Sequence, residues 1–304
     1  MDEKLITICV ISYNSSRTIL ETLNSVKNQT YKNIELIISD DCSKDDTVDI
    51  TKKWLEDNKN KINGKIITTT VNNGTAINLR RGIENATGEW IKIIAADDIL
   101  DEKCISTFMD EVIKNPEISF FCCDLEPFCA EGEVAQSTIL ALDNFFKTYN
   151  KSYEQKLKEN DYKYTIMGPG YFFSKKMYDE IGGFDERFPM YEEYPFVYKA
   201  INAGYDVRPV DKKLVKYRVS NTSLSGNTRS PAAKRLLQSK KDFFNQVRKP
   251  SLLKKHMYLR VWQEIIRFKV QTIKTYSDNK LVCFMANFLY LLSPRHYIDF
   301  IRKN

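Results

Sequence analysis

Strand-like and helix-like segments alternate through the first hundred residues, and this alternation limits the fold more than any other feature of the chain. Strands that alternate with helices are typical of a mostly parallel sheet with helices packed on it. The sequence therefore predicts an α/β fold with a single Rossmann-like sheet. The expected strands are apolar, β-branched runs at 5–11, 34–39, 65–70 and 91–96, and the expected helices are at 17–28, 44–62 and 75–85.

Two adjacent acids, Asp97 and Asp98, follow directly on the last of these strands. Ligands of open α/β sheets bind at the carboxyl ends of strands, and packing gives no reason for two like charges there. Their oxygens suit Mg²⁺ or Mn²⁺ on a diphosphate, because magnesium commonly takes one or two protein carboxylates together with phosphate oxygens. From the residues alone, a turn or a helix cap remains an equal alternative, since Asp is common at both.

Polar loops also follow the earlier strands, so Tyr13 and Asp41 are expected to line the same crevice as Asp97 and Asp98. None of these loops contains GxGxxG or GxxxxGK[ST], which argues against a dinucleotide-dependent oxidoreductase and a P-loop NTPase. Both histidines, His256 and His296, lie late in the chain, so a zinc site or a Ser-His-Asp triad is hard to assemble.

Several motifs in the same order resemble family 2 glycosyltransferases, which are inverting enzymes with the GT-A fold. The resemblance covers roughly residues 4–225. The motifs are the run from Ile8 to Asn14, Asn28-Gln29-Thr30-Tyr31, Ile37-Ile38-Ser39-Asp40-Asp41-Cys42-Ser43-Lys44-Asp45-Asp46-Thr47, Asn73-Gly74, and Ala86-Thr87-Gly88-Glu89-Trp90-Ile91 with Asp97-Asp98.

The resemblance implies a nucleotide-sugar site in the first hundred residues. Ile11, Tyr13, Asp41 and Asp97 would contact the nucleotide, with Tyr13 stacked near the base and Asp41 hydrogen-bonded to it, and Asp98 would hold a divalent cation, Mn²⁺ or Mg²⁺. The commoner family pattern has a third acid two positions before Asp97, where this chain has Ala95. An alternative for Tyr13 is an aromatic side chain that simply packs at a loop.

A second stretch resembles the acceptor side of the same family. Gly182-Gly183-Phe184-Asp185-Glu186 precedes the acidic pair Glu192 and Glu193. By the resemblance Glu193 would be the general base, although the family more often has Asp there. Acids are also favoured in the first turn of a helix by its dipole, which is the alternative. Gly170 and Arg218 are further acceptor-side candidates, and Arg218 either contacts phosphate or pairs with a core acid.

The expected function is inverting transfer of a single sugar from a nucleoside-diphosphate sugar, with UDP the first choice, to a glycan or lipid-linked acceptor in surface polysaccharide synthesis. A single transfer is expected because the QxxRW segment of processive family members is missing. The alternative is a degenerate GT-A domain that only binds nucleotide or glycan, with Ala95 and Glu193 as marks of lost catalysis. A nucleic-acid reader is disfavoured because no such motif occurs.

The expected domains are a catalytic domain at 1–228, divided into a nucleotide-sugar half (1–100) and an acceptor half (101–228), and a basic helical extension at 229–304. The extension carries 17 Lys or Arg and 4 Asp or Glu, a net charge of +13, whereas the whole chain carries +6. Basic amphipathic helices either bind anionic membranes or pack on the catalytic domain with solvated lysines.

The expected location is the cytoplasm, with peripheral contact at the inner face of the plasma membrane if the extension binds lipid. The start of the chain leads directly into a strand and carries no secretory signal. The longest apolar run, 281–292, is too short to span a bilayer. The seven cysteines have no regular spacing, which favours buried, reduced thiols.

Overall fold

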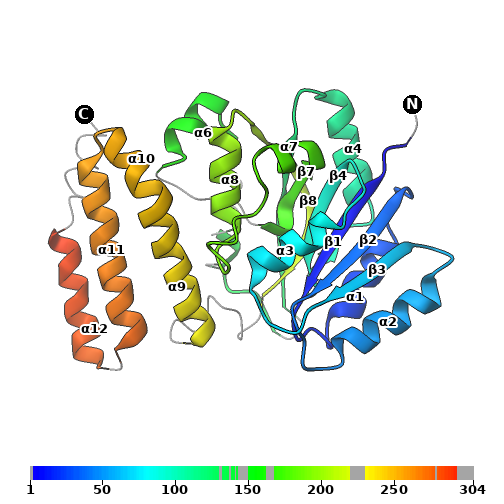
Figure 1. Ribbon diagram of the computed structural model, residues 1–304, viewed down its shortest axis with the longest axis horizontal. Coiled ribbons are helices and arrows are strands. Elements are labelled where there is room, and N and C mark those ends of the chain that lie inside the picture. The colour runs from blue at the N-terminus through cyan, green and yellow to red at the C-terminus, as the bar shows by residue number, and fades with distance from the viewer. Residues whose placement is uncertain are drawn as a thin grey trace. The chain divides into compact units, whose positions relative to one another are not determined.

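The computed structural model describes residues 3–129, 132–136, 138–140, 142, 150–161, 168–219, 230–277 and 279–292. It divides into two units, Met1–Val219 and Ser220–Asn304, and each is considered by itself. Within the described part of the first unit, one 8-stranded sheet has the order β3-β2-β1-β4-β7-β6-β8-β5. Figure 1 shows helices on both faces of this sheet.

The first half of the sheet is parallel, as the alternation of strands and helices predicts. β1 (Ile6–Ser12) lies between β2 (Ile34–Asp40) and β4 (Trp90–Ala95), and β3 (Asn63–Thr68) pairs with β2 at the edge. The second half is mixed: β7 (Tyr171–Ser174) is antiparallel to β4 and to β6 (Phe120–Phe128), and β8 (Val207–Arg218) is parallel to β6 and antiparallel to β5 (Ile99–Leu100).

Each face of the sheet has its own hydrophobic core. Period-two alternation sends Ile6, Ile8 and Val10 of β1 to one face and Cys9 to the other. The first face is covered by α1 (Ile19–Lys27), α2 (Thr47–Asn58) and α4 (Cys104–Lys114), and the second by α3 (Thr75–Glu84), α7 (Lys175–Glu180) and α8 (Glu193–Asn202).

The predicted elements of the first hundred residues all form, with ends that differ by a few residues. The third strand, expected at 65–70, runs from Asn63 to Thr68, because its pairing with β2 begins where Asn63 lies beside Glu35. Residues 143–149 lie outside the described part of the chain, and α6 (Tyr153–Glu159) comes after them. A short 3₁₀ turn, η1 (Gly168–Gly170), leads into β7.

The second unit is helical in its described part. It contains α9 (Pro231–Phe243), a short π-helical segment η2 (Phe244–Arg248), α10 (Lys249–Lys254), α11 (Tyr258–Tyr276), α12 (Lys280–Ala286) and the 3₁₀ segment η3 (Asn287–Leu292). Its core joins α9, α10 and α11 through Leu237, Leu252 and Phe268. Among all described residues of the chain, no helix is both long and apolar enough to cross a membrane.

Candidate active site

The carboxyl ends of β1, β2 and β4 meet at one edge of the sheet. The register places Ser12 beside Asp40 and Ile11 beside Ala95, so the three loops that follow leave the sheet together. The backbone N–H of Asp41 donates to Ser12 O at 2.9 Å, and that of Ala96 donates to Ile11 O at 2.9 Å. The sequence-predicted donor residues therefore follow neighbouring strands at one edge of the sheet.

The loops after β1 and β2 are bonded to each other rather than to solvent. Asn14, which adopts a positive φ of 52°, donates its N–H to Ser43 Oγ at 2.8 Å and accepts from the N–H of Lys44 at 2.8 Å. Tyr13 lies in this loop with 49% of its surface exposed, so its ring is open to a ligand. Asn is one of the few non-glycine residues that adopt this conformation readily, and both of its hydrogen bonds fix the two loops together.

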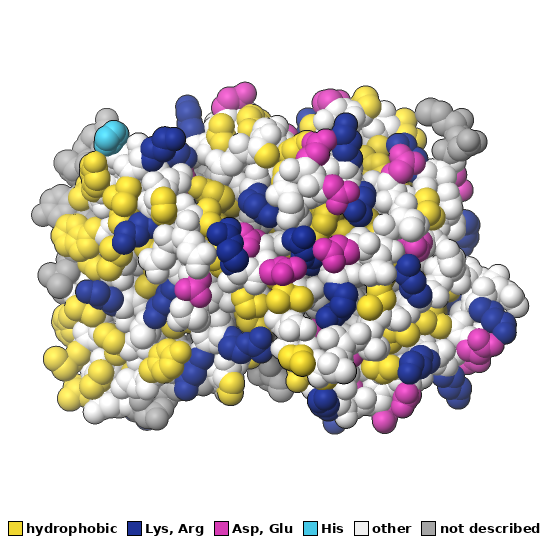
Figure 2. All heavy atoms as spheres, viewed as in Figure 1, with side chains coloured by type: hydrophobic (Ala, Val, Ile, Leu, Met, Phe, Trp, Pro, Cys, Tyr) yellow, Lys and Arg dark blue, Asp and Glu magenta, His cyan; other side chains and the backbone are white. Residues whose placement is uncertain are grey.

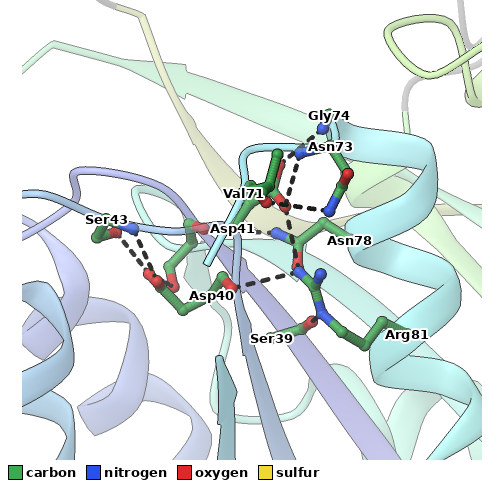
Figure 3. Close-up of polar contacts among 10 residues, drawn as sticks. Ser39, Asp40, Asp41, Ser43, Val71, Asn73, Gly74, Asn78 and Arg81 are labelled. Carbon is green, nitrogen blue, oxygen red and sulfur yellow. Dashed lines mark hydrogen bonds and ion pairs between the residues drawn. The ribbon is translucent and has the colours of Figure 1, made fainter. Parts of the chain in front are cut away.

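Asp41 is buried at the carboxyl end of β2 and is held by the loop that leads into α3. Its carboxylate accepts from the N–H groups of Asn73 at 3.2 Å and Gly74 at 2.7 Å, and it forms an ion pair with Arg81 at 3.2 Å. Figure 3 shows these contacts converging on Asp41 from α3 and the preceding loop. Because these bonds occupy three acceptor positions, a nucleobase would meet a carboxylate that is already fixed in place.

Arg81 was not singled out from the sequence, yet it ties the donor loops together. Its guanidinium donates to Asn78 Oδ1 at 2.6 Å, to Ser39 Oγ at 3.2 Å and to the backbone oxygen of Asp40 at 3.2 Å (Figure 3). A planar guanidinium can serve several acceptors at once because its five N–H groups have fixed directions.

Asp97 and Asp98 leave β4 in different environments. Asp97 is half-buried, whereas Asp98 is 1% exposed. Burial raises the pKa of both carboxyl groups, and the neighbouring Asp97 raises that of Asp98 further. Asp98 Oδ1 accepts from the N–H of Arg218 at 2.9 Å, but Oδ2 is buried and has no hydrogen-bond partner among the residues that the structure describes.

A buried carboxylate oxygen without a partner is costly unless something else binds it. A divalent cation on a diphosphate would satisfy Asp98 Oδ2, and the half-buried Asp97 lies beside it, so these residues fit the group. Within the described part of the chain, no group of three or more His, Cys, Asp or Glu side chains could enclose a metal ion. The pair agrees with the way magnesium uses one or two protein carboxylates and takes its other ligands from phosphate and water.

Arg218, expected near phosphate or a core acid, reaches back over the start of the crevice. Its side chain donates to Glu21 at 2.8 Å and to the backbone oxygen of Asp97 at 2.8 Å, and its guanidinium carbon lies 4.5 Å from the ring centre of Phe128. The arginine therefore fixes the position of Asp97 through the backbone.

Glu193 opens α8 on the acceptor side and is half-buried. Its Oε1 accepts from the N–H of Gly168 at 2.5 Å. Glu192 precedes it at the N-cap position, and Gly170 is buried against β6, where a Cβ would come within 2.7 Å of Cys123 O. Gly170 thus permits close packing of the turn on the strand, while Glu193 is the carboxylate that the turn holds.

Tyr217 of β8 was not expected from the sequence. Burial raises its pKa, and the charges of Asp98, Glu193 and Asp97 raise it further, to about 12. The next residue, Arg218, holds Asp98 through its backbone N–H.

Comparison with known proteins is consistent with this arrangement. The family model described as glycosyl transferase family 2 matches residues 7–182. The glycosyltransferase GlyG of Streptococcus pneumoniae is 33% identical over 110 residues, which are 36% of this chain and 35% of that protein. A relative from Escherichia coli, UDP-Glc:alpha-D-GlcNAc-diphosphoundecaprenol beta-1,3-glucosyltransferase WfgD, is 34% identical over 120 residues, or 40% of this chain and 45% of WfgD. The chain thus spans less than half the length of these two relatives.

Solved structures share the fold at low identity. Staphylococcus aureus TarS 1–349 in complex with UDP-GlcNAc has a TM-score of 0.57 and 17% identity, with coverage of 90% of this chain and 82% of TarS. The mannosyltransferase PcManGT from Pyrobaculum calidifontis, in complex with GDP-Man and Mn²⁺, has a TM-score of 0.56 and 15% identity, with coverage of 94% and 85%. Both likenesses support the GT-A fold.

Proposed function

Because this chain belongs to glycosyl transferase family 2, we propose that it transfers one sugar from a nucleoside-diphosphate sugar to an acceptor hydroxyl, with inversion at the anomeric carbon. The observation that supports the proposal most directly is that carboxylates are held on connected elements: Asp98 accepts from the N–H of Arg218, and Glu193 accepts from the turn Gly168–Gly170, to which Lys92 of β4 donates. Such a transfer needs carboxylates for two tasks. One is to hold the cation on the diphosphate, and the other is to take the proton from the acceptor hydroxyl.

The donor is proposed to be a UDP-sugar. Its nucleotide would lie over Ile11 and Tyr13, with Asp41 toward the base and Asp97 toward the ribose. The exposed ring of Tyr13 and the rigid setting of Asp41 support this placement. The name of WfgD and the UDP-GlcNAc complex of TarS favour UDP, whereas the complex of PcManGT contains GDP-Man, so the base is open to test.

Asp98, beside Asp97, would hold Mn²⁺ or Mg²⁺ through its unpartnered Oδ2. When bound, the cation supplies charge neutralisation at the departing nucleoside diphosphate. Glu193 takes the proton from the acceptor hydroxyl, which makes the oxygen a stronger nucleophile. The oxygen then attacks the anomeric carbon opposite the diphosphate, the bond to the diphosphate breaks, and no sugar is linked to the enzyme.

The acceptor is proposed to be a glycan or a lipid-linked sugar in surface polysaccharide synthesis, with Glu192, Gly170 and Arg218 on its side of the crevice. WfgD is named for a diphosphoundecaprenol acceptor, which supports a lipid-linked molecule. The competing function is a degenerate domain that binds nucleotide or glycan without transfer. The half-buried Ala95, which replaces an acid of the commoner pattern, is the observation in its favour.

The proposed partner of the C-terminal unit, Ser220–Asn304, is an anionic bilayer and not a nucleic acid. Binding to such a bilayer would place the protein at the cytoplasmic face of the plasma membrane. The side chains of Leu281, Val282, Phe284, Met285 and Phe288 are each between 42% and 65% exposed. Figure 2 shows hydrophobic side chains gathered over the region of α11 and α12 with lysines and arginines among them. Apolar insertion and the +13 charge of residues 229–304 together match a negatively charged lipid surface.

Isothermal titration with UDP, GDP, CDP and dTDP, each with and without Mn²⁺, tests the donor proposal. We expect one nucleotide to bind, and to bind more tightly with the metal. Binding by none of the four to folded protein would overturn the donor site. Binding without any release of nucleotide from the corresponding sugar donors would favour the degenerate domain instead.

A further inference from the structure

Lys92 is the one residue of the β4 apolar run that carries a charge, and its side chain is fully buried. Its ammonium group donates to the backbone oxygens of Ile93 at 3.0 Å and Tyr171 at 3.3 Å, and also to that of Pro169. An ammonium carries three hydrogen-bond donors, so all of them are used. Burying an ammonium group costs free energy even when its hydrogen bonds are satisfied, so we expect Lys92 to have a role beyond packing.

The ammonium lies where two strands separate. β4 and β7 pair only from Trp90 beside Ser174 to Lys92 beside Phe172. Beyond that point β7 pairs with β6 through Tyr171, while β4 continues along β1 to Ala95. Lys92 therefore bridges the two diverging strands with side-chain hydrogen bonds at the place where backbone pairing between them stops.

The two branches lead to the two sides of the candidate site. β4 runs on to Asp97 and Asp98. The other branch is the turn Gly168–Gly170, whose Pro169 oxygen accepts from Lys92 and whose Gly168 N–H donates to Glu193. Two hydrogen bonds, connected by the backbone of Gly168 and Pro169, thus join β4 to the carboxylate that opens α8.

We propose that Lys92 is a positioning residue that fixes the separation between the donor carboxylates at the end of β4 and the carboxylate of Glu193. This rests on the proposed function, because it assumes that Glu193 is the base. A compact ammonium can meet three convergent carbonyl oxygens, whereas the planar guanidinium of arginine cannot match them in the same space. A displacement of about 1 Å can cost about 10²-fold in rate, so a small change in this separation is measurable.

The test uses the full chain and follows UDP release from UDP-glucose or UDP-GlcNAc with Mn²⁺ and water as acceptor. The variants are Lys92→Met, which keeps an apolar stem without donors, and Lys92→Gln, which keeps one amide. The matched control is Lys156→Met, because Lys156 is also buried and donates to Asp206 at 2.7 Å and Val207 O at 2.8 Å, away from the site.

We expect both Lys92 variants to lower UDP release by about 10-fold to 10²-fold while the affinity for UDP stays within about threefold of wild type. Hydrogen exchange at the Gly168 and Tyr171 amides should quicken in these variants and stay unchanged in Lys156→Met. Equal effects of Lys92→Met and Lys156→Met on UDP release would overturn the proposal, since they would reflect only lost stability.

A double-mutant cycle with Glu193→Gln separates this inference from the proposed function. If Lys92 acts through Glu193, Lys92→Gln should have little further effect once Glu193 is replaced. If the losses of UDP release in the two single variants instead multiply in the double variant, the positioning role of Lys92 is overturned, whereas the assignment of Glu193 as the base stands. A Glu193→Gln variant with wild-type release would overturn the proposed base itself.

If neither Lys92 variant folds, Gly168→Ala tests the same path at its other end. A Cβ at residue 168 would lie 2.9 Å from Glu193 Oε1, so the carboxylate must move away from the turn. The expected result is a fall in UDP release of at least about 10-fold with UDP binding retained. Release within about twofold of wild type would show that the turn does not position Glu193.

Discussion

The backbone N–H of Arg218 donates a 2.9 Å hydrogen bond to Oδ1 of Asp98, which precedes it by 120 residues. The bond fixes the orientation of the carboxylate and leaves Oδ2 as a buried atom with no hydrogen-bond partner. β8 thus holds Asp98 by one carboxylate oxygen, and the other oxygen is the one that we propose to bind a cation.

The first prediction concerns Asp98→Asn. The amide oxygen can still accept from Arg218, so the fold should be retained, while the Mn²⁺-dependent part of UDP binding should be lost. Because burial raises the pKa of this carboxyl group, its ionisation opposes folding of the metal-free protein, so Asp98→Asn should be more stable than wild type at pH values above about 4.

Isothermal titration and urea denaturation measure these two effects, with Asp110→Asn, an exposed acid of α4, as control. Undiminished metal-dependent binding in Asp98→Asn would refute the role of Asp98 as a cation ligand.

The second prediction concerns the carboxylate that fixes the donor loop. Asp41→Ala removes the acceptor for the Asn73 and Gly74 amides and leaves Arg81 without its ion-pair partner. Breaking a buried pair on one side costs about 3 kcal/mol, and UDP binding should weaken by at least about 10-fold because the base contact is lost as well.

Urea denaturation and isothermal titration check this result. The exposed acid Asp57 of α2 supplies the control variant Asp57→Ala. Loss of stability with unchanged UDP affinity would show that Asp41 holds the loop but does not meet the nucleotide.

The third prediction is a dependence of stability on pH near the donor loops. Although partial burial opposes it, hydrogen bonds from Thr47 and Ser16 hold the pKa of Asp45 at about 2. A carboxyl group with a lowered pKa stabilises the fold at pH values above its unfolded pKa, which is about 3.9. That contribution is lost as the pH falls from about 4 toward 2.

Asp45→Asn should therefore lose less stability than wild type between pH 5 and pH 2, as measured by urea denaturation at a series of pH values. Parallel curves for the two proteins would contradict this assignment.

The parallel half of the sheet, and the place of Asp97 and Asp98 directly after a buried strand, could be predicted from the sequence because they depend on local patterns. Apolar runs of β-branched residues gave four strands, and Asp97 and Asp98 follow a run that is buried at nearly every position. The path through Lys92 could not be predicted in the same way. Its acceptors are backbone oxygens 77 and 79 residues away, which have no side-chain signature.

Arg81 illustrates the same limit. Its position on α3 is unremarkable in a helical pattern, and only the packing of α3 on β1 and β2 brings it to Asp41 and Ser39. Its contacts depend on long-range strand register, whereas sequence patterns report on neighbours within one element. For Lys92 a local signal does exist, because a lysine within an otherwise apolar, buried run is unusual.

The fourth prediction concerns the C-terminal unit. Phe284→Ser combined with Phe288→Ser should reduce sedimentation of the protein with vesicles that contain phosphatidylglycerol, by at least about fivefold in partition coefficient, because two exposed apolar side chains are lost. Binding should also weaken with added salt and be low on neutral phosphatidylcholine vesicles.

The control is Val71→Ser with Ile113→Ser, two exposed apolar residues of the catalytic unit. Equal vesicle binding by all three proteins would refute the lipid surface. A concentration-dependent dimer that the Phe284 and Phe288 changes abolish would assign the surface to a second copy of the chain.

The role of Glu193 is tested most directly by UDP release from UDP-glucose and UDP-GlcNAc in Glu193→Gln, compared with wild type and with Glu111→Gln at a partly exposed acid of α4. We expect a loss of about 10²-fold to 10⁴-fold in Glu193→Gln, with UDP affinity preserved and Glu111→Gln equal to wild type. Release by Glu193→Gln at the wild-type rate would contradict the assignment of Glu193 as the base, and absence of release by the wild type with any nucleotide sugar that it binds would contradict sugar transfer itself.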